Sequence, residues 1–228
     1  MKLLVVLLVL GGLFVAADRV AVGFAEHRVA EEIAQKGGLQ GTPDVDIDGF
    51  PFLTQAIAGR YDEVSISLTA EELGQPEGTD ADVTLRGVQV PLSSVISGSV
   101  QEVPVDSIDG TATLSYELLA AQLGGDAQVE REGDGLRVSR TVEVLGQTFP
   151  VSAAGTVTLQ GNQLLVDVEQ AEGAGVELPG FLVDQASDLL DLRYEVPPLP
   201  FGLQLTSVQP GQDGVDVAVE ASDTVLRG

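Results

Sequence analysis

The sequence has no cysteine and no tryptophan, and it has one histidine in 228 residues. Without cysteine the chain can form no disulfide, no thiolate nucleophile and no cysteine-ligated metal site. The single histidine, His27, cannot build a metal site from several imidazole ligands. Aromatic residues make up only 4% of the chain. The core must therefore consist mainly of Val, Leu, Ile and Ala, of which Val and Ile favour β-strands.

Basic residues are also scarce, because 11 Lys and Arg stand against 35 Asp and Glu, which gives a net charge of −24. Nucleic-acid binding depends on basic side chains that neutralise phosphates, so we expect no nucleic-acid partner. An anionic lipid surface would not attract such a chain electrostatically either. Contact with a membrane must then depend on the N-terminal segment or on apolar patches, and the acidity itself indicates a well-solvated surface.

Recognisable catalytic motifs are missing from the sequence, which has no nucleotide-binding glycine fingerprint, no His-Glu-x-x-His and no Gly-x-Ser-x-Gly. Asp44, Asp46 and Asp48 alternate along a predicted strand, about 7 Å apart, and lack the loop spacing of a calcium site. We expect them to form a solvated face, and we expect His27 to be solvated as well. The pattern favours a non-enzymatic protein without metal or cofactor, while a glycosidase-like pair among the many carboxylates stays open.

An apolar run occupies residues 3–17, after the positive charge of Lys2. As a helix it would extend roughly 22 Å, which is short of the ~30 Å hydrocarbon core of a membrane. Small residues before Asp18 are typical of a cleaved secretory signal peptide. The alternative is an uncleaved membrane anchor that continues to Ala25. Both place residues 18–228 in the cell envelope, on the extracytoplasmic side of the plasma membrane, either released or anchored.

Residues 18–228 are predicted to form a single α+β domain with an antiparallel sheet. An apolar stripe at spacings of three and four predicts a helix over residues 18–36, and Gly37 and Gly38 end it. After Pro43 the apolar period is two, which indicates strands. Further helices are predicted over residues 115–123 and 179–192.

Two shifts of the apolar face predict β-bulges and hence a curved sheet. One lies at Gly87, after which the apolar positions are Val88, Val90 and Leu92, and the other lies at residues 106–107. Turn residues predict a hairpin at Gly161 and Asn162 and another at residues 210–214.

Residues 49–61 form a concentrated aromatic and apolar cluster, in which Phe50 and Phe52 flank Pro51 and glycines bracket a short apolar turn. Such a cluster must be buried against either core or ligand. We expect the proline and the glycines to turn the chain so that both phenylalanine rings point inward.

Residues 45–55 (VDIDGFPFLTQ), followed by residues 59–61 (GRY), resemble the signature of the LmeA-like phospholipid-binding family of actinobacterial envelope proteins. The tail is also similar to this family, at residues 199–203, 207–208 and 214–215. The resemblance covers essentially the whole exported part. It implies a TULIP-like tubular fold, in which a long curved antiparallel sheet wraps around amphipathic helices and encloses a tunnel for acyl chains. It also implies binding of phospholipids of the phosphatidylinositol type and, in mycobacterial relatives, a role in maturing mannose-containing lipoglycans.

The leading hypothesis is a non-enzymatic phospholipid-binding protein, with or without lipid transfer. The alternatives are a membrane-tethered structural or interaction module with a filled core, and an envelope hydrolase that uses carboxylates. Nine apolar residues are candidates for lining the lipid site, although each would also suit an ordinary core. They are Val29, Ile33, Phe50, Phe52, Leu53, Ile57, Tyr61, Ile66 and Phe181.

Overall fold

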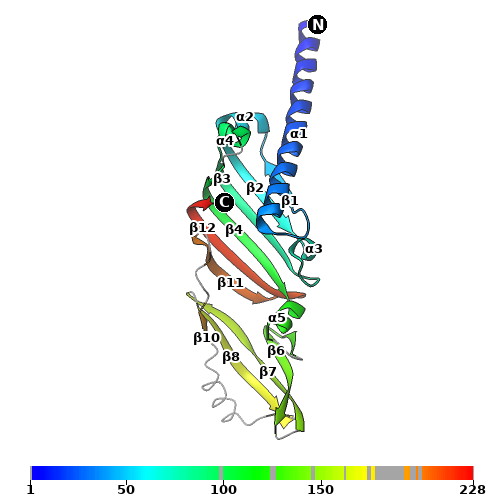
Figure 1. Cartoon of the computed structure of the whole chain (residues 1–228), viewed down its shortest axis with the longest axis vertical. Helices are drawn as coiled ribbons and strands as arrows, with labels where there is room; N and C mark the ends of the chain where they lie inside the picture. The colour runs from blue at the N-terminus through cyan, green and yellow to red at the C-terminus, as the bar shows by residue number, and fades with distance from the viewer. Residues whose placement is uncertain are drawn as a thin grey trace. The chain divides into compact units, whose positions relative to one another are not determined.

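The computed structural model describes residues 2–97, 100–123, 127–144, 147–161, 163–173, 176–177, 193–195, 199 and 202–227 (Figure 1). The protein is α+β, with a long N-terminal helix and two antiparallel sheets, which confirms the predicted fold class. The helix predicted over residues 179–192, with Phe181, lies outside the described residues. The helices are α1 (Lys2–Gly37), α2 (Phe52–Ala58), α3 (Ala70–Leu73), α4 (Leu92–Ser97) and α5 (Tyr116–Leu123). The strands are β1 (Asp44–Asp48), β2 (Arg60–Leu68), β3 (Asp80–Gln89), β4 (Glu102–Ser115), β5 (Gln128–Glu132), β6 (Gly135–Val144), β7 (Gln147–Gln160), β8 (Gln163–Gly173), β9 (Val176–Glu177), β10 (Arg193–Glu195), β11 (Gln204–Pro210) and β12 (Gly214–Arg227).

The chain divides into two compact units, and each is described by itself. The first unit comprises Met1–Gly74, Asp82–Gly110 and Ala221–Gly228. The second comprises Gln75–Ala81 and Thr111–Glu220. The expectation of a single domain over residues 18–228 stays a prediction.

Helix α1 is continuous from Lys2 to Gly37, so that the apolar run and the helix predicted after it form one element. No proline or turn residue interrupts the sequence between them. The helix ends where expected, because Gly38 adopts a φ of +65° that glycine tolerates without strain. At 1.5 Å per residue the helix is about 54 Å long.

Strand β1 is an edge of the first sheet, whose strand order is β1-β2-β3-β4-β12-β11. It pairs antiparallel with β2, from Asp44 opposite Ser67 to Asp48 opposite Glu63. The alternation is as predicted, since Val45 and Ile47 are buried and the three aspartates of β1 are exposed. Helix α1 packs against β1 and α2, which places the core of this unit between the helix and the sheet (Figure 1).

The two shifts of apolar face have structural counterparts in β3 and β4. Gly87, inside β3, has a φ of +65°, the conformation that glycine supplies in a bulge. In β4, Val105 and Ile108 are both buried although they are three residues apart, so the buried face changes between them as the sequence predicted. A side chain at position 87 would collide with Asp106.

The second sheet has the strand order β10-β8-β7-β6-β5, with β9 paired to β8. Strands β7 and β8 form the predicted hairpin, in which Gln160 lies opposite Gln163. The final hairpin is also confirmed, because Pro210 of β11 lies opposite Val215 of β12. In both hairpins a tight turn joins two neighbouring strands directly, and for this reason the turn residues alone predicted where the hairpins lie.

Three short helices of the first unit, α2, α3 and α4, were not predicted by the apolar pattern. The segment interpreted as an apolar turn forms α2, preceded by Pro51 and ended by Gly59 in a left-handed conformation. Leu92 was expected to continue a strand, but β3 ends at Gln89 and Leu92 begins α4. The carbonyl of Pro91 accepts the first hydrogen bonds of α4. Helices of seven residues or fewer are too short to show a helical period in the sequence.

Candidate functional site

Four of the nine candidate residues come from the connection between β1 and β2, which contains α2, and a fifth, Tyr61, lies at the start of β2. Phe52 is 5% exposed, whereas Phe50 is 60% and Ile57 is 77% exposed. Leu53 and Tyr61 are half-buried. The expectation that both phenylalanine rings point inward is therefore wrong for Phe50, because the chain turns at Pro51 and only the second ring enters the core.

Phe52 and Gln55 fix α2 to the two strands that flank it. The ring of Phe52 packs on that of Tyr61, with the centroids 6.1 Å apart and the planes tilted by 33°. The side-chain amide of Gln55 donates a hydrogen bond to the carbonyl of Asp48 at 3.0 Å and accepts one from the amide of Asp62 at 2.8 Å. Because Gln55 is buried, both of its amide groups are satisfied inside the protein.

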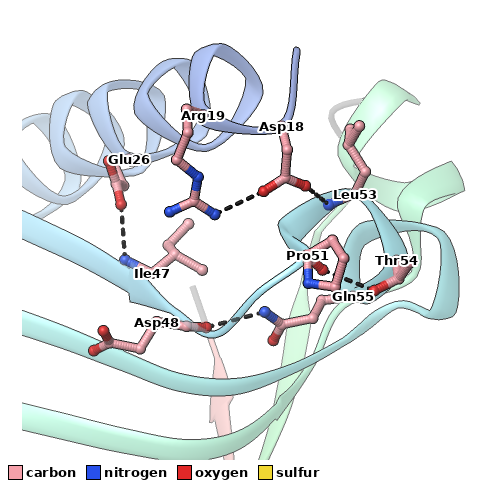
Figure 2. A network of polar contacts seen from close by, with 9 residues as sticks. All are labelled: Asp18, Arg19, Glu26, Ile47, Asp48, Pro51, Leu53, Thr54 and Gln55. Carbon is pink, nitrogen blue, oxygen red and sulfur yellow. Dashed lines mark hydrogen bonds and ion pairs between the residues drawn. The ribbon is translucent and has the colours of Figure 1, made fainter. Parts of the chain in front are cut away.

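Asp18 joins α1 to the start of α2, as Figure 2 shows. Its side chain is completely buried, and one carboxylate oxygen accepts a hydrogen bond from the backbone amide of Leu53 at 2.8 Å. The other oxygen pairs with Arg19 at 2.7 Å. The Arg19 guanidinium in turn lies 5.4 Å from the centre of the Phe50 ring, within cation–π range. The sequence patterns did not predict a role for Asp18. Its partner is a backbone amide far along the chain, and because almost every residue type has such an amide, no motif marks the contact.

Glu26 makes the second polar contact of α1 with the sheet. Its carboxylate accepts a hydrogen bond from the backbone amide of Ile47 at 3.0 Å (Figure 2). Since β1 is an edge strand, this amide would otherwise be free to pair with another chain. Helix α1 is therefore held to the first unit at two levels, by Asp18 at α2 and by Glu26 at β1.

The remaining candidates lie apart from this network. Val29 on α1 is 37% exposed and Ile33 is half-buried. Ile66 is half-buried on β2, opposite Val45 of β1. Phe181 lies outside the described residues. A lipid-lining role for each candidate stays a prediction.

Four exposed apolar side chains belong to α2, α4 and the loop before α2. The two helices lie together at one end of β2 and β3 (Figure 1). Phe50, Ile57, Leu92 and Val95 form this set, here called the apolar tip, and are 60%, 77%, 38% and 50% exposed. Helices α2 and α4 contact each other. The amide of Val90 also donates to the carbonyl of Gly59 at 2.9 Å, which ties the end of α2 to the start of α4.

The apolar tip belongs to two uncharged segments, residues 49–59 and 87–101. Charged residues make up 20% of the whole chain. The tip thus presents large apolar side chains from segments that carry no charge of their own, and Arg19 of α1 places a guanidinium over the Phe50 ring. Exposed apolar surface of this kind is what soluble proteins use for contact with an apolar partner.

The chemical groups of the described part of the chain give no support to catalysis. His27 is 70% exposed and lies 3.5 Å from Glu31, as a solvated histidine would. No group of three His, Asp or Glu side chains among the described residues is placed to hold a metal ion. Burial raises the pKa of the Tyr61 hydroxyl, which keeps that group neutral and suits it to an apolar environment.

Helix α1 is long and apolar enough to cross a membrane, and a signal sequence near the N-terminus would have the same properties. No curated protein and no solved structure matches the chain. The model of one family, described as LmeA-like phospholipid-binding, matches residues 16–220. The match includes the buried Asp18, α2, the second sheet and the first sheet except the end of β12, and on this evidence the chain belongs to the LmeA-like phospholipid-binding family.

Proposed function

We propose that this chain is a non-enzymatic protein of the cell envelope that binds a phospholipid. The observation that carries the proposal is family membership over residues 16–220, which covers nearly the whole chain beyond the apolar run. A phosphatidylinositol-type lipid is the ligand that the family resemblance favours.

The chemistry of the first unit is compatible with a binding role. Its buried carboxylate, Asp18, serves a structural contact with Leu53 and Arg19 and is not aimed at a cleft. The polar groups of Gln55 are likewise used within the fold. Binding of an acyl chain needs apolar surface and few oriented polar groups, and the half-buried Leu53, Tyr61 and Ile66 supply such surface.

Lipid recovery from the purified protein tests the proposal. The full chain would be purified in detergent, extracted with organic solvent and analysed by mass spectrometry, and the delipidated chain would be offered labelled phosphatidylinositol and phosphatidylcholine. We expect about one phospholipid per chain and preferential uptake of phosphatidylinositol. Recovery of no lipid together with no uptake would overturn the proposal and favour a structural module with a filled core.

A matched pair of variants on β2 locates the lipid. Ile66 and Ser65 are neighbours whose side chains point to opposite faces of the strand. Ile66→Ala should lower the amount of bound lipid, and Ser65→Ala should leave it unchanged. Equal lipid content in both variants would remove Ile66 from the site without affecting the proposal that lipid is bound.

A further inference from the structure

Helix α1 has two different faces in the part that follows the apolar run. Asp18, Val22 and Ala30 are buried, on the face that packs against α2 and β1. Val20 and Phe24 are 75% and 68% exposed, on the side that faces away from the first unit. Large apolar groups on a helix face without a protein partner need another apolar environment.

The exposed face continues the apolar run without a break. An open apolar surface along the helix is formed by Leu13, Ala16, Ala17, Val20, Ala21 and Phe24. These residues recur at intervals of three and four or at adjacent positions, so they form one stripe. From Leu3 to Phe24 the helix extends about 33 Å, which matches the ~30 Å hydrocarbon core that residues 3–17 alone do not reach.

Two charged residues, Asp18 and Arg19, interrupt this stretch in the sequence, but the structure accommodates both charges. The Asp18 carboxylate is shielded from the surroundings by α2 and is paired with Arg19 and with the Leu53 amide. The long Arg19 side chain is half exposed, and an arginine near the end of a span can extend its guanidinium toward the headgroups. The stripe of α1 therefore stays apolar as far as Phe24.

The Asp18–Leu53 contact then sets the level of α2 in the bilayer. Asp18 precedes Phe24 by six residues, which is about 9 Å along the helix axis. The start of α2, and the α4 that contacts it, must lie within the boundary between headgroups and acyl chains if α1 crosses as far as Phe24. The apolar tip belongs to these two helices and the loop before them.

We propose that α1 crosses the bilayer as far as Phe24 and that the apolar tip, Phe50, Ile57, Leu92 and Val95, is inserted into the interface of the leaflet that α1 leaves. Apolar contact is the interaction available, because a chain of net charge −24 gains nothing from anionic headgroups. Amphipathic surface elements insert about 5–10 Å into this boundary. The inference goes beyond the binding of a single lipid molecule and does not depend on it.

Because the chain has no tryptophan, a single introduced indole reports on one position. The full chain would be reconstituted into phosphatidylcholine vesicles whose acyl chains carry bromine, which quenches indole emission on contact. The variants are Phe24→Trp, Val95→Trp and, as the control, Glu71→Trp, all at exposed positions. Glu71 lies on α3, at the other end of β2 from α2, about 30 Å away by the rise of a nine-residue strand (Figure 1).

We expect the indoles at positions 24 and 95 to lose emission in brominated vesicles and to emit at shorter wavelength, and the indole at position 71 to do neither. If the indole at position 24 or at position 95 were quenched no more than the indole at position 71, the proposal would be overturned. That result would mean that water or a second copy of the chain, and not lipid, covers the site. Equal quenching at all three positions would overturn it too. Solvent extraction of the full chain purified in detergent, before reconstitution, measures bound phospholipid separately, so that absence of lipid there would count against the proposed function alone.

Discussion

The carboxylate of Asp18 accepts a hydrogen bond from the backbone amide of Leu53 at 2.8 Å, although the two residues lie 35 positions apart. The first amides of a helix have no partners within it, and Pro51, the residue that precedes α2, has no side chain to cap them. A carboxylate from another element supplies the missing acceptor. The position of α2, and with it the apolar tip, thus depends on a residue of α1.

Removal of the Asp18 carboxylate should loosen α2. We expect Asp18→Ala to lower the melting temperature of the full chain in detergent micelles, because the Leu53 amide loses its acceptor and Arg19 its partner. Asp18→Asn should have a smaller effect, because asparagine keeps an oxygen that can accept from Leu53. Circular dichroism during heating gives the melting temperatures of the wild type, Asp18→Ala and Asp18→Asn.

Asp46→Ala is the control for the loss of a carboxylate. Asp46 is exposed on β1, and its removal relieves repulsion in a chain of net charge −24, so we expect no fall in melting temperature. If Asp18→Ala and Asp46→Ala melted together, the contact between α1 and α2 would contribute nothing to stability.

Phe52 and Ile57 should respond oppositely to truncation, although they lie on the same short helix. Phe52 is 5% exposed and packs on Tyr61, so Phe52→Ala should cost about 3–5 kcal/mol of unfolding free energy. Ile57 is 77% exposed, and Ile57→Ala should change stability by no more than about 0.5 kcal/mol. Urea denaturation of both variants in the same detergent makes the comparison.

Truncation of Phe52 also tests a question that the sequence leaves open, which is whether this ring is core or lipid contact. If Phe52→Ala lost bound lipid but kept the wild-type stability, the ring would be a lipid contact. Its packing on Tyr61 would then contribute nothing to the stability of the fold.

The sequence predicted those features that depend on local periodicity. The alternation of β1 and the β7–β8 hairpin follow from period-two patterns and a turn glycine, Gly161. The family block at residues 45–55 indicated phospholipid binding before any fold was known.

Such patterns did not predict contacts between segments that are distant in the sequence. The exposure of Phe50 and the burial of Phe52 depend on where α1 packs, and neighbouring phenylalanines look alike in the sequence. Helix α4 begins at Leu92, directly after Pro91, and a proline at that position is equally compatible with the end of a strand. Asp18 looked like the first residue after an apolar run, and only the position of Leu53 gives it a structural role.

Gly87 should tolerate a methyl group less well than Gly38, although both have a φ of +65°. A left-handed conformation alone costs alanine about 1–2 kcal/mol, which both variants incur. At position 87 the added Cβ would also collide with the carboxylate of Asp106, which is paired with Arg60, whereas nothing lies within 4 Å at position 38. We therefore expect Gly87→Ala to unfold at lower urea concentration than Gly38→Ala. Equal midpoints would show that Asp106 moves aside without cost.

Tyr61 should ionise above the usual tyrosine pKa of 10.0, because burial disfavours the phenolate. A pKa that is higher in the folded than in the unfolded state stabilises the protein fully below the unfolded value. That contribution is lost as pH rises through the folded value. The stability advantage of the wild type over Tyr61→Phe should therefore shrink in strongly alkaline solution. The tyrosinate absorbance of the wild type minus that of Tyr61→Phe gives the titration of this one residue.

Tyr116 is the matched control, because burial raises its pKa as well and it lies in the other unit. If Tyr61 borders the lipid site, adding phospholipid to the delipidated chain should raise the pKa of Tyr61 further, since an acyl chain replaces water around the phenol. The pKa of Tyr116 should not change. A lipid-induced rise at Tyr116 with none at Tyr61 would move the lipid site from the first unit to the second.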